Sequence, residues 1–297
     1  MRWFTQLMLM AVCAAGCSSA GKSTGAGGSA VIPPPMPRRA IARSDTPPPF
    51  AQIEIEPGYT LFVPYLRRLR PVTGLTVHFH GEPWFVLEEH MRRGSRMPLL
   101  CVALGQGSSV YRVPFEDQKK LSQLVKKIET ELQMQVIGID ISSFSAGYGA
   151  VREIVKVPEY RALIHTIVLC DSMYASFAPN STTQPAAEHI EPWIAFAKMA
   201  AKGQKTFVFT YSQVPTSTYA NSAMCATALI DAMGGSKVKV SRGSLPATLD
   251  PEFPLLTRTD VGHFHVWGYD GADAPAHLTH VRHLADVRKA LDAAGEP

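Results

Sequence analysis

The residues with the clearest capacity for chemistry follow a short apolar segment near the middle of the chain. Residues 136–141 are apolar and rich in β-branched side chains, which predicts a strand buried on both faces. Small residues follow at once, and a helical pattern resumes at Val151 and Ile154. A strand that turns this sharply into a helix needs small side chains at the turn and pushes the side chain at its tip outward. Ser145 occupies that tip, so we predict that its hydroxyl is a nucleophile.

The turn resembles the nucleophile elbow of the α/β-hydrolase superfamily, which is written G-x-S-x-G. Residues 143–147 read Ser-Phe-Ser-Ala-Gly, so the last three positions fit and Ser143 replaces the first glycine. The resemblance implies acyl transfer by a serine, assisted by a histidine and a carboxylate. The alternative is an ordinary helix start, capped by Ser142 or Ser143, with Ser145 in the first turn.

A carboxylate that could orient the base follows the next predicted strand. A serine hydroxyl needs a base within hydrogen-bond reach and a third group that holds the base in the right tautomer. In the superfamily the acid and then the histidine follow the serine in chain order. Asp171 comes directly after the strand at 166–170, whereas residues 210–213, the commoner place for the acid, contain no carboxylate. We therefore assign the acid to Asp171; the alternative is that it caps a helix or turn.

The C-terminal part offers several histidines as the base. These are His263, His265, His277, His280 and His283. His277 lies beyond the loop after the last predicted strand, where the base falls in the superfamily, so we choose it. His280, one helical turn later, is the reserve base. The alternative for each histidine is an exposed position on a helix.

Backbone N–H groups must receive the negative charge that forms on attack. One should come from Ala146, next to the nucleophile. The other should come from the loop after the strand at 75–80, from Gly81 or Glu82, since Pro83 has no N–H. This loop resembles the HG-type oxyanion loop of esterases and lipases. The aromatic side chains expected around the substrate pocket, unless they serve only in packing, are Trp84, Tyr148 and Tyr174.

A metal site is the rival hydrolytic interpretation. His78 and His80 alternate along one predicted strand, as do His263 and His265, and alternate histidines can ligate zinc. The first pair is similar to the start of the H-x-H-x-D-H metallohydrolase motif, but Glu82 stands where that motif needs aspartate. We therefore predict no metal and no cofactor.

The N-terminus has the pattern of an export signal. Arg2 precedes an apolar core at 7–12 and small residues at 13–19, and the whole is too short to span a membrane. The stretch before Cys17 resembles a bacterial lipobox, which implies a lipid on Cys17 and attachment to an envelope membrane, with the domain in the periplasm. A plain secretory signal is the alternative. Residues 18–48 are Gly/Ser-rich and then Pro-rich, as in a tether.

The length allows one large α/β domain or two small ones, and we expect a single domain over residues 49–297. The chain has 297 residues, of which 46% are hydrophobic, and a net charge of +4 without a long basic run. A substantial core is therefore possible, and nothing indicates a nucleic-acid partner.

Strand-like and helix-like segments alternate from residue 53 onward, which predicts a mostly parallel sheet with helices on both faces. The predicted strands are 53–56, 59–63, 75–80, 99–104, 136–141, 166–170, 206–210 and 264–267. The predicted helices are 85–93, 116–132, the one after Ser145, 188–202, 221–233 and 276–293. Eight strands with the serine after the fifth is the pattern of the α/β-hydrolase sheet.

Besides the His-based metallohydrolase discussed above, two classes of function remain open on the sequence. The first is a serine hydrolase that cleaves an ester, less readily an amide, from a small molecule or an envelope component. The second is a non-catalytic hydrolase-like module that binds an envelope partner, which a missing triad residue would favour.

Overall fold

The computed structural model of the chain describes residues 48–65, 72–240, 252–293 and 295. The predicted signal peptide, the lipid attachment at Cys17 and all but the last residue of the tether lie outside the described residues. None of the helices in the described ranges has the length and apolar character of a membrane span.

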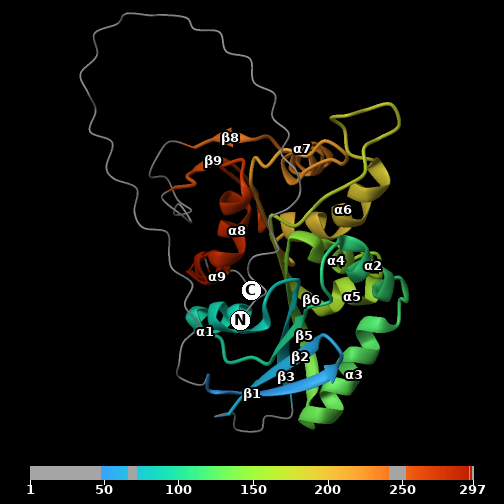
Figure 1. Ribbon diagram of the computed structural model, residues 1–297, viewed down its shortest axis with the longest axis vertical. Helices are drawn as coiled ribbons and strands as arrows, with labels where there is room; N and C mark the ends of the chain where they lie inside the picture. The colour runs from blue at the N-terminus through green and yellow to red at the C-terminus, as the bar shows by residue number, and fades with distance from the viewer. Residues whose placement is uncertain (1–47, 66–71, 241–251, 294, 296–297) are drawn as a thin grey trace, which may run out of the picture. The chain divides into compact units, whose positions relative to one another are not determined.

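The centre of the fold is one sheet with the strand order β1-β2-β4-β3-β5-β6-β7-β10-β9-β8 (Figure 1). Its strands are β1 (Phe50–Glu56), β2 (Tyr59–Pro64), β3 (Val72–Phe79), β4 (Leu99–Val102), β5 (Gln135–Phe144), β6 (Ile164–Cys170), β7 (Thr206–Tyr211), β8 (Val238–Lys239), β9 (Leu255–Val261) and β10 (Phe264–Tyr269). Strands β4, β3, β5, β6, β7 and β10 pair in parallel, and antiparallel strands flank them on both sides. The mostly parallel sheet and its order confirm the predicted α/β-hydrolase fold class.

The predicted number of eight strands is wrong, because the described residues form ten. The two additional strands are β8, which has only two residues, both exposed, and β9, which mixes apolar residues with Thr257, Arg258 and Asp260. Both lie at the outer edge, beyond the parallel strands. Edge strands with polar side chains lack the continuous apolar run from which the other strands were predicted.

The helices are α1 (Pro83–Arg93), α2 (Ser108–Glu116), α3 (Lys120–Leu132), α4 (Tyr148–Ile154), α5 (Pro158–Leu163), α6 (Ala187–Ala201), α7 (Ser222–Ala232), α8 (Ala274–Arg282) and α9 (Leu284–Ala293). A short 3₁₀ helix, η1 (Ser145–Gly147), precedes α4. The predicted helix over 116–132 starts later, at Lys120, and α2 was not predicted because its interior Pro114 obscures the helical pattern. The predicted helix over 276–293 is two helices, which break at His283.

The two faces of the sheet bury different helices. Ile167 and Leu169 of β6 belong to a core shared with helices α2, α3, α4, α6 and α7. Val168 and Cys170, which alternate with them, pack with residues of α8 and α9 on the other face. Helix α1 packs over β4 near the same face, and Figure 1 shows α1 beside α9. Both sides of the central strands are therefore covered, which explains their continuous apolar sequences.

The parallel pairing brings the carboxyl ends of β3, β5 and β6 to one edge. Gly147, just after β5, lies so close to the end of β3 that a Cβ there would stand 2.3 Å from the Phe79 carbonyl oxygen. Only glycine permits this approach. The turn after β5 is therefore fixed directly against the loop that begins after β3.

Candidate active site

Ser145 is the first residue after β5 and has a left-handed backbone conformation. Its φ is +47°, which is rare for a residue with a side chain and costs about 1–3 kcal/mol. The four preceding residues are buried, whereas Ser145 is partly exposed. The strand, the sharp turn and the helix α4 thus have the elbow arrangement predicted from the sequence.

Small residues around Ser145 make the turn possible. A Cβ on Gly149 would lie 2.3 Å from the Ser108 carbonyl oxygen of α2, so α2 and α4 pack closely there. Ser143, which replaces the first glycine of the motif, is fully buried. Its Oγ lies 2.8 Å from Ser172 Oγ, so the additional hydroxyl has a partner.

Asp171 and His277, predicted as the acid and the base, are hydrogen-bonded to each other. His277 Nδ1 lies 2.7 Å from Asp171 Oδ2, and the carboxylate accepts this hydrogen bond. The Asp171 side chain is 1% exposed and that of His277 is 21% exposed. With the proton on Nδ1, the Nε2 of His277 carries a lone pair, as a general base requires.

Ser212 donates two further hydrogen bonds to the Asp171 carboxylate, one of them to the oxygen that also accepts from His277. Its Oγ donates to Asp171 Oδ2 over 2.5 Å, and its backbone N–H donates to Oδ1 over 3.2 Å. Burial alone would raise the pKa of Asp171, but the hydrogen bonds from His277 and Ser212 and the nearby His280 outweigh it. The net result is a pKa well below the usual range, so the carboxylate stays ionised.

A stack of rings places His277 beside the nucleophile turn. The Phe144 ring lies 4.6 Å from the His277 ring and 5.8 Å from the His80 ring, centroid to centroid. Phe144 directly precedes Ser145, so the imidazole packs against the turn itself. Ser145 Oγ forms no hydrogen bond with the described residues, including His277; such bonds are often long in unliganded sites.

The loop after β3 carries N–H groups that are available to a ligand. His80 has φ +68° and Gly81 φ +143°, so the chain turns sharply there. The N–H groups of Gly81 and Glu82 donate no hydrogen bond to any part of the chain that the structure describes. Ala146 lies at the start of a helix, where N–H groups lack helical partners. These three residues are the predicted oxyanion donors.

Two histidines make hydrogen bonds in and around this loop. The Ser142 hydroxyl lies 2.8 Å from His78 Nδ1, and His78 Nε2 donates to the His80 carbonyl over 2.9 Å. His80 Nδ1 lies 2.9 Å from the Tyr111 hydroxyl. The two imidazoles therefore have different partners. Throughout the described ranges, no group of three or more His, Cys, Asp or Glu side chains could hold a metal ion.

His280, the reserve base, occupies a different place. It is fully buried, and its Nδ1 lies 2.8 Å from Thr210 Oγ1. The second pair of alternate histidines is also separated: His265 Nδ1 contacts Asp260 over 2.6 Å, and His263 lies in the turn before β10. Among the candidate histidines, His277 is the one that donates a hydrogen bond to the Asp171 carboxylate in the described residues.

Two of the three predicted pocket aromatics contact each other. The rings of Tyr148 and Tyr174 lie 5.5 Å apart, and the Tyr174 hydroxyl donates to the Asp171 carbonyl over 3.1 Å. Trp84 contacts Phe85 in α1 instead. Tyr219, which the sequence analysis missed, extends the pair: its ring lies 5.7 Å from Tyr174 and is 43% exposed. Burial, with Tyr148 and Asp171 nearby, raises the pKa of Tyr219.

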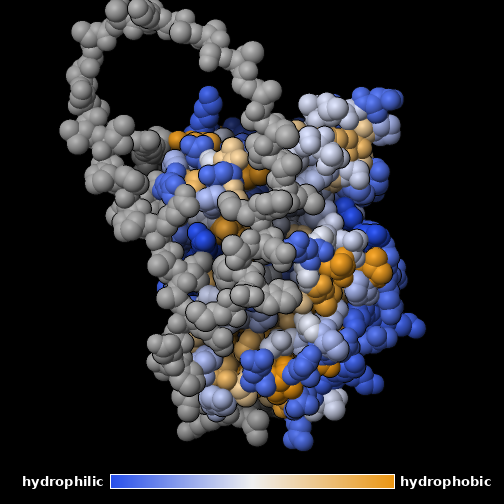
Figure 2. Space-filling view, viewed as in Figure 1, coloured by the Kyte–Doolittle hydropathy of each residue, from blue (hydrophilic) through white to orange (hydrophobic). Residues whose placement is uncertain are grey.

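Apolar surface continues from these tyrosines over α2. The Tyr148 hydroxyl donates to Ser108 Oγ at the start of that helix over 3.1 Å. Val110 and Val113 of α2 are 37% and 54% exposed. Figure 2, drawn in the same view as Figure 1, shows apolar surface in the region where Figure 1 labels α2.

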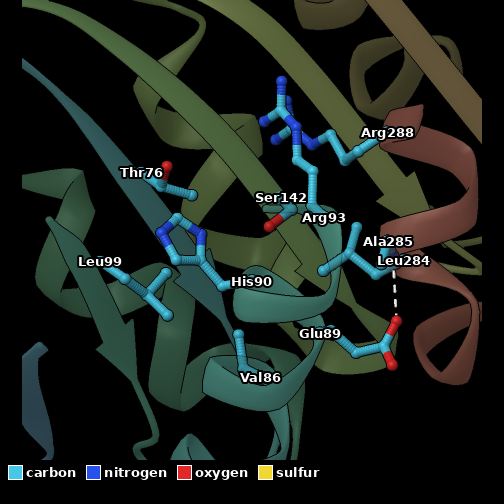
Figure 3. Close-up of a pocket in the computed structure, with 10 residues that line it drawn as sticks. All are labelled: Thr76, Val86, Glu89, His90, Arg93, Leu99, Ser142, Leu284, Ala285 and Arg288. Atoms are coloured by element: carbon cyan, nitrogen blue, oxygen red, sulfur yellow. Dashed lines mark hydrogen bonds between the residues drawn. The ribbon is translucent and has the colours of Figure 1, made fainter. Parts of the chain in front are cut away.

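A separate small cavity lies between the sheet and helices α1 and α9 (Figure 3). Its lining includes Glu89, Arg93 and Arg288, whose charges are matched by neighbours: Glu89 pairs with Arg92, and both Arg93 and Arg288 approach Asp140. Neither Ser145 nor His277 lines it. The cavity therefore belongs to the packing of α1 and α9 on the sheet, not to the candidate active site.

Neither a family model nor a curated protein sequence matches the chain. Among solved structures, it is similar to an esterase from Thermogutta terrifontis, with 13% identity, a TM-score of 0.49, and coverage of 84% of this chain and 93% of that one. It is also similar to an acetyl xylan esterase from Aspergillus awamori, with 10% identity, a TM-score of 0.46, and coverage of 75% and 93%. A bifunctional GH43-CE protein from Bacteroides eggerthii is matched over 59% of this chain, with 12% identity and a TM-score of 0.37; the chain spans only 31% of that protein.

Buried histidines should make the fold sensitive to acid. Burial lowers the pKa of His78 to about 3 and those of His80, His90 and His280 to about 4, against 6.5 ordinarily. Between pH 6.5 and 4 the unfolded chain binds protons that the native chain does not. The free energy of unfolding should therefore fall as the pH drops, near pH 5 by about 1.4 kcal/mol per pH unit for each histidine.

Urea unfolding between pH 4.5 and 7 measures this slope. His90 donates through Nε2 to the Met97 carbonyl and lies far from the candidate triad in the chain, so His90→Gln keeps a donor while removing one titrating group. Near pH 5, unfolding of the variant should take up about one proton fewer than unfolding of the wild type, so its free energy of unfolding should depend less steeply on pH. An unchanged slope in His90→Gln would show that this histidine is not buried in its neutral form.

Proposed function

We propose that the chain is a serine hydrolase that cleaves esters, with Ser145 as nucleophile, His277 as general base and acid, and Asp171 as orienting carboxylate. The observation that carries this proposal is the buried Asp171–His277 hydrogen bond, whose imidazole packs against the turn that presents Ser145. A buried, ionised carboxylate that fixes a histidine tautomer beside a strained serine is the arrangement that nucleophilic catalysis needs.

The proposed reaction proceeds through an acyl-enzyme. His277 Nε2 takes the proton of Ser145 Oγ as the oxygen attacks the ester carbonyl carbon. The oxyanion receives hydrogen bonds from the N–H of Ala146 and from that of Gly81 or Glu82. The imidazolium then gives its proton to the departing alkoxide, which leaves as the alcohol, and the acyl group stays on Ser145. A water molecule, deprotonated in turn by His277, attacks the acyl carbon, and His277 returns the proton to Ser145 Oγ as the acid leaves. Asp171 stays ionised throughout, and no cofactor takes part.

Esters are the easier substrates on chemical grounds, since an alkoxide is a better leaving group than an amide anion and an ester carbonyl has less resonance stabilisation than an amide. The substrate is proposed by class, as a small-molecule or envelope-derived ester.

The alternative is a hydrolase-like module that binds without catalysis. The observation in its favour is that Ser145 Oγ and His277 are not hydrogen-bonded among the described residues. A probe that reacts only with activated serines separates the two functions.

Fluorophosphonate labelling should depend on Ser145. We expect the wild-type chain to be labelled, Ser145→Ala to be unlabelled, and Ser145→Ala to hydrolyse 4-nitrophenyl acetate about 10⁴-fold or more slowly. Ser176→Ala, which removes an exposed serine elsewhere, should react as the wild type does. A folded wild-type chain that neither reacts with the probe nor hydrolyses the ester would support the binding module.

Tyr219 should contact the bound substrate. Its exposed ring continues the Tyr148–Tyr174 pair beside Asp171, so we propose that these tyrosines line one side of the substrate pocket. Tyr219→Ala should raise the KM for 4-nitrophenyl acetate about fivefold, the loss of about 1 kcal/mol of ring contact, with kcat within about twofold. Tyr65→Ala, which removes an exposed ring at the end of β2, serves as the control. Equal KM values for Tyr219→Ala and Tyr65→Ala would show that Tyr219 does not contact the substrate.

We further propose that the protein is exported and held on an envelope membrane by a lipid on Cys17, on the evidence of the N-terminal sequence alone. Cys17→Ala should then move the protein from the membrane fraction to the soluble fraction of bacteria that express it. The activity per molecule should not change. Membrane attachment that persists in Cys17→Ala would contradict the lipid anchor.

A further inference from the structure

We infer that Ser143 and Ser172 are positioning residues, which hold the backbone of Ser145 in its strained conformation and link it to the loop of Asp171. The inference rests on the proposed function. It concerns the position at which this chain departs from the elbow motif, where Ser143 replaces a glycine.

Two hydrogen bonds connect these residues in series. Ser172 Oγ donates to the Ser145 carbonyl oxygen over 2.9 Å. Ser143 Oγ lies 2.8 Å from Ser172 Oγ. Since a hydroxyl has one proton and that of Ser172 goes to a carbonyl, which can only accept, Ser143 must be the donor to Ser172. The order is therefore Ser143 to Ser172 to Ser145, which we call the serine bridge.

The serine bridge connects two strained positions. Ser145 has φ +47° and Asp171, the neighbour of Ser172, has φ +44°. Both follow directly on the ends of the paired strands β5 and β6. Left-handed residues with side chains persist only where the surroundings hold them. A hydrogen bond to the Ser145 carbonyl restrains the peptide that follows the nucleophile, which carries the N–H of Ala146.

Burial makes this link stiff. Ser143 and Ser172 are both fully buried, so water cannot replace either partner. A glycine at 143 would leave Ser172 Oγ without the donor that it now accepts from. The replacement of glycine by serine thus adds a restraint at this turn, and does not simply fill space.

The order of the bridge predicts unequal variants. Ser172→Ala removes both hydrogen bonds, whereas Ser143→Ala removes one and leaves Ser172 bound to the Ser145 carbonyl. For 4-nitrophenyl acetate, Ser172→Ala should lower kcat about tenfold and Ser143→Ala about threefold, each with KM within twofold, because the loss concerns the reacting geometry. The double variant should match Ser172→Ala, since Ser143 acts only through Ser172.

The experiment measures kcat, KM and the rate of fluorophosphonate labelling for these three variants, together with thermal unfolding. Thr259→Val is the matched control, because it removes a buried hydroxyl on β9, away from the site, that donates to the Ser236 carbonyl over 2.8 Å. All the variants should lose some stability, but only the bridge variants should lose kcat and labelling rate. Ser143→Gly, which restores the elbow motif, should behave as Ser143→Ala does and provides a second test if Ser172→Ala fails to fold.

The outcomes separate the bridge from the proposed function. A wild-type chain without labelling or hydrolysis overturns the proposed function and the inference that rests on it. An active wild type with Ser172→Ala and Ser143→Gly within twofold of it in kcat overturns the bridge alone. So does a double variant whose loss equals the product of the single losses, since Ser143 would then act independently of Ser172.

Discussion

The hydrogen bond between Asp171 and His277 is the interaction on which the candidate site depends. It joins residues 106 positions apart in sequence and is formed because β6, β7 and β10 lie side by side in parallel. Asp171 follows β6 directly, and His277 enters from α8, beyond β10. A charge buried to this extent is tolerable only because His277 and Ser212 both donate to it. The sheet therefore determines the partner of the carboxylate, and the carboxylate determines the tautomer of the base.

Strain is concentrated at the same edge of the sheet. Five described residues other than glycine have positive φ, and three of them, His80, Ser145 and Asp171, belong to the loops after β3, β5 and β6. Each is restrained by buried contacts: the His80 carbonyl by His78, the Ser145 carbonyl by Ser172, and the Asp171 carbonyl by Tyr174. Such conformations persist when neighbouring structure over-determines them. Three side chains at this edge, those of His78, Ser172 and Tyr174, thus each donate to the backbone carbonyl of a residue with positive φ.

The central strands could be predicted from the sequence because each is a continuous apolar run, and their parallel order followed from the alternation with helices. Strands β8 and β9 could not, since polar edge strands have no such run. At the site, chain order and strand ends led to Ser145, Asp171 and His277, two of which the structure joins. The roles of Ser172 and Tyr219 could not be predicted, because their partners are distant in sequence and only the folded chain brings them together.

Ser212, at the end of the neighbouring strand β7, supports the Asp171 carboxylate. Residues 210–213 contain no carboxylate, which is why the sequence predicts the acid after the previous strand. Ser212 follows β7 directly, and its hydroxyl and backbone N–H both donate to Asp171. The end of β7 faces the buried Asp171 carboxylate. A hydrogen-bond donor there stabilises the negative charge, whereas an acceptor would repel it. Ser212 provides this donor twice, through its hydroxyl and through its backbone N–H.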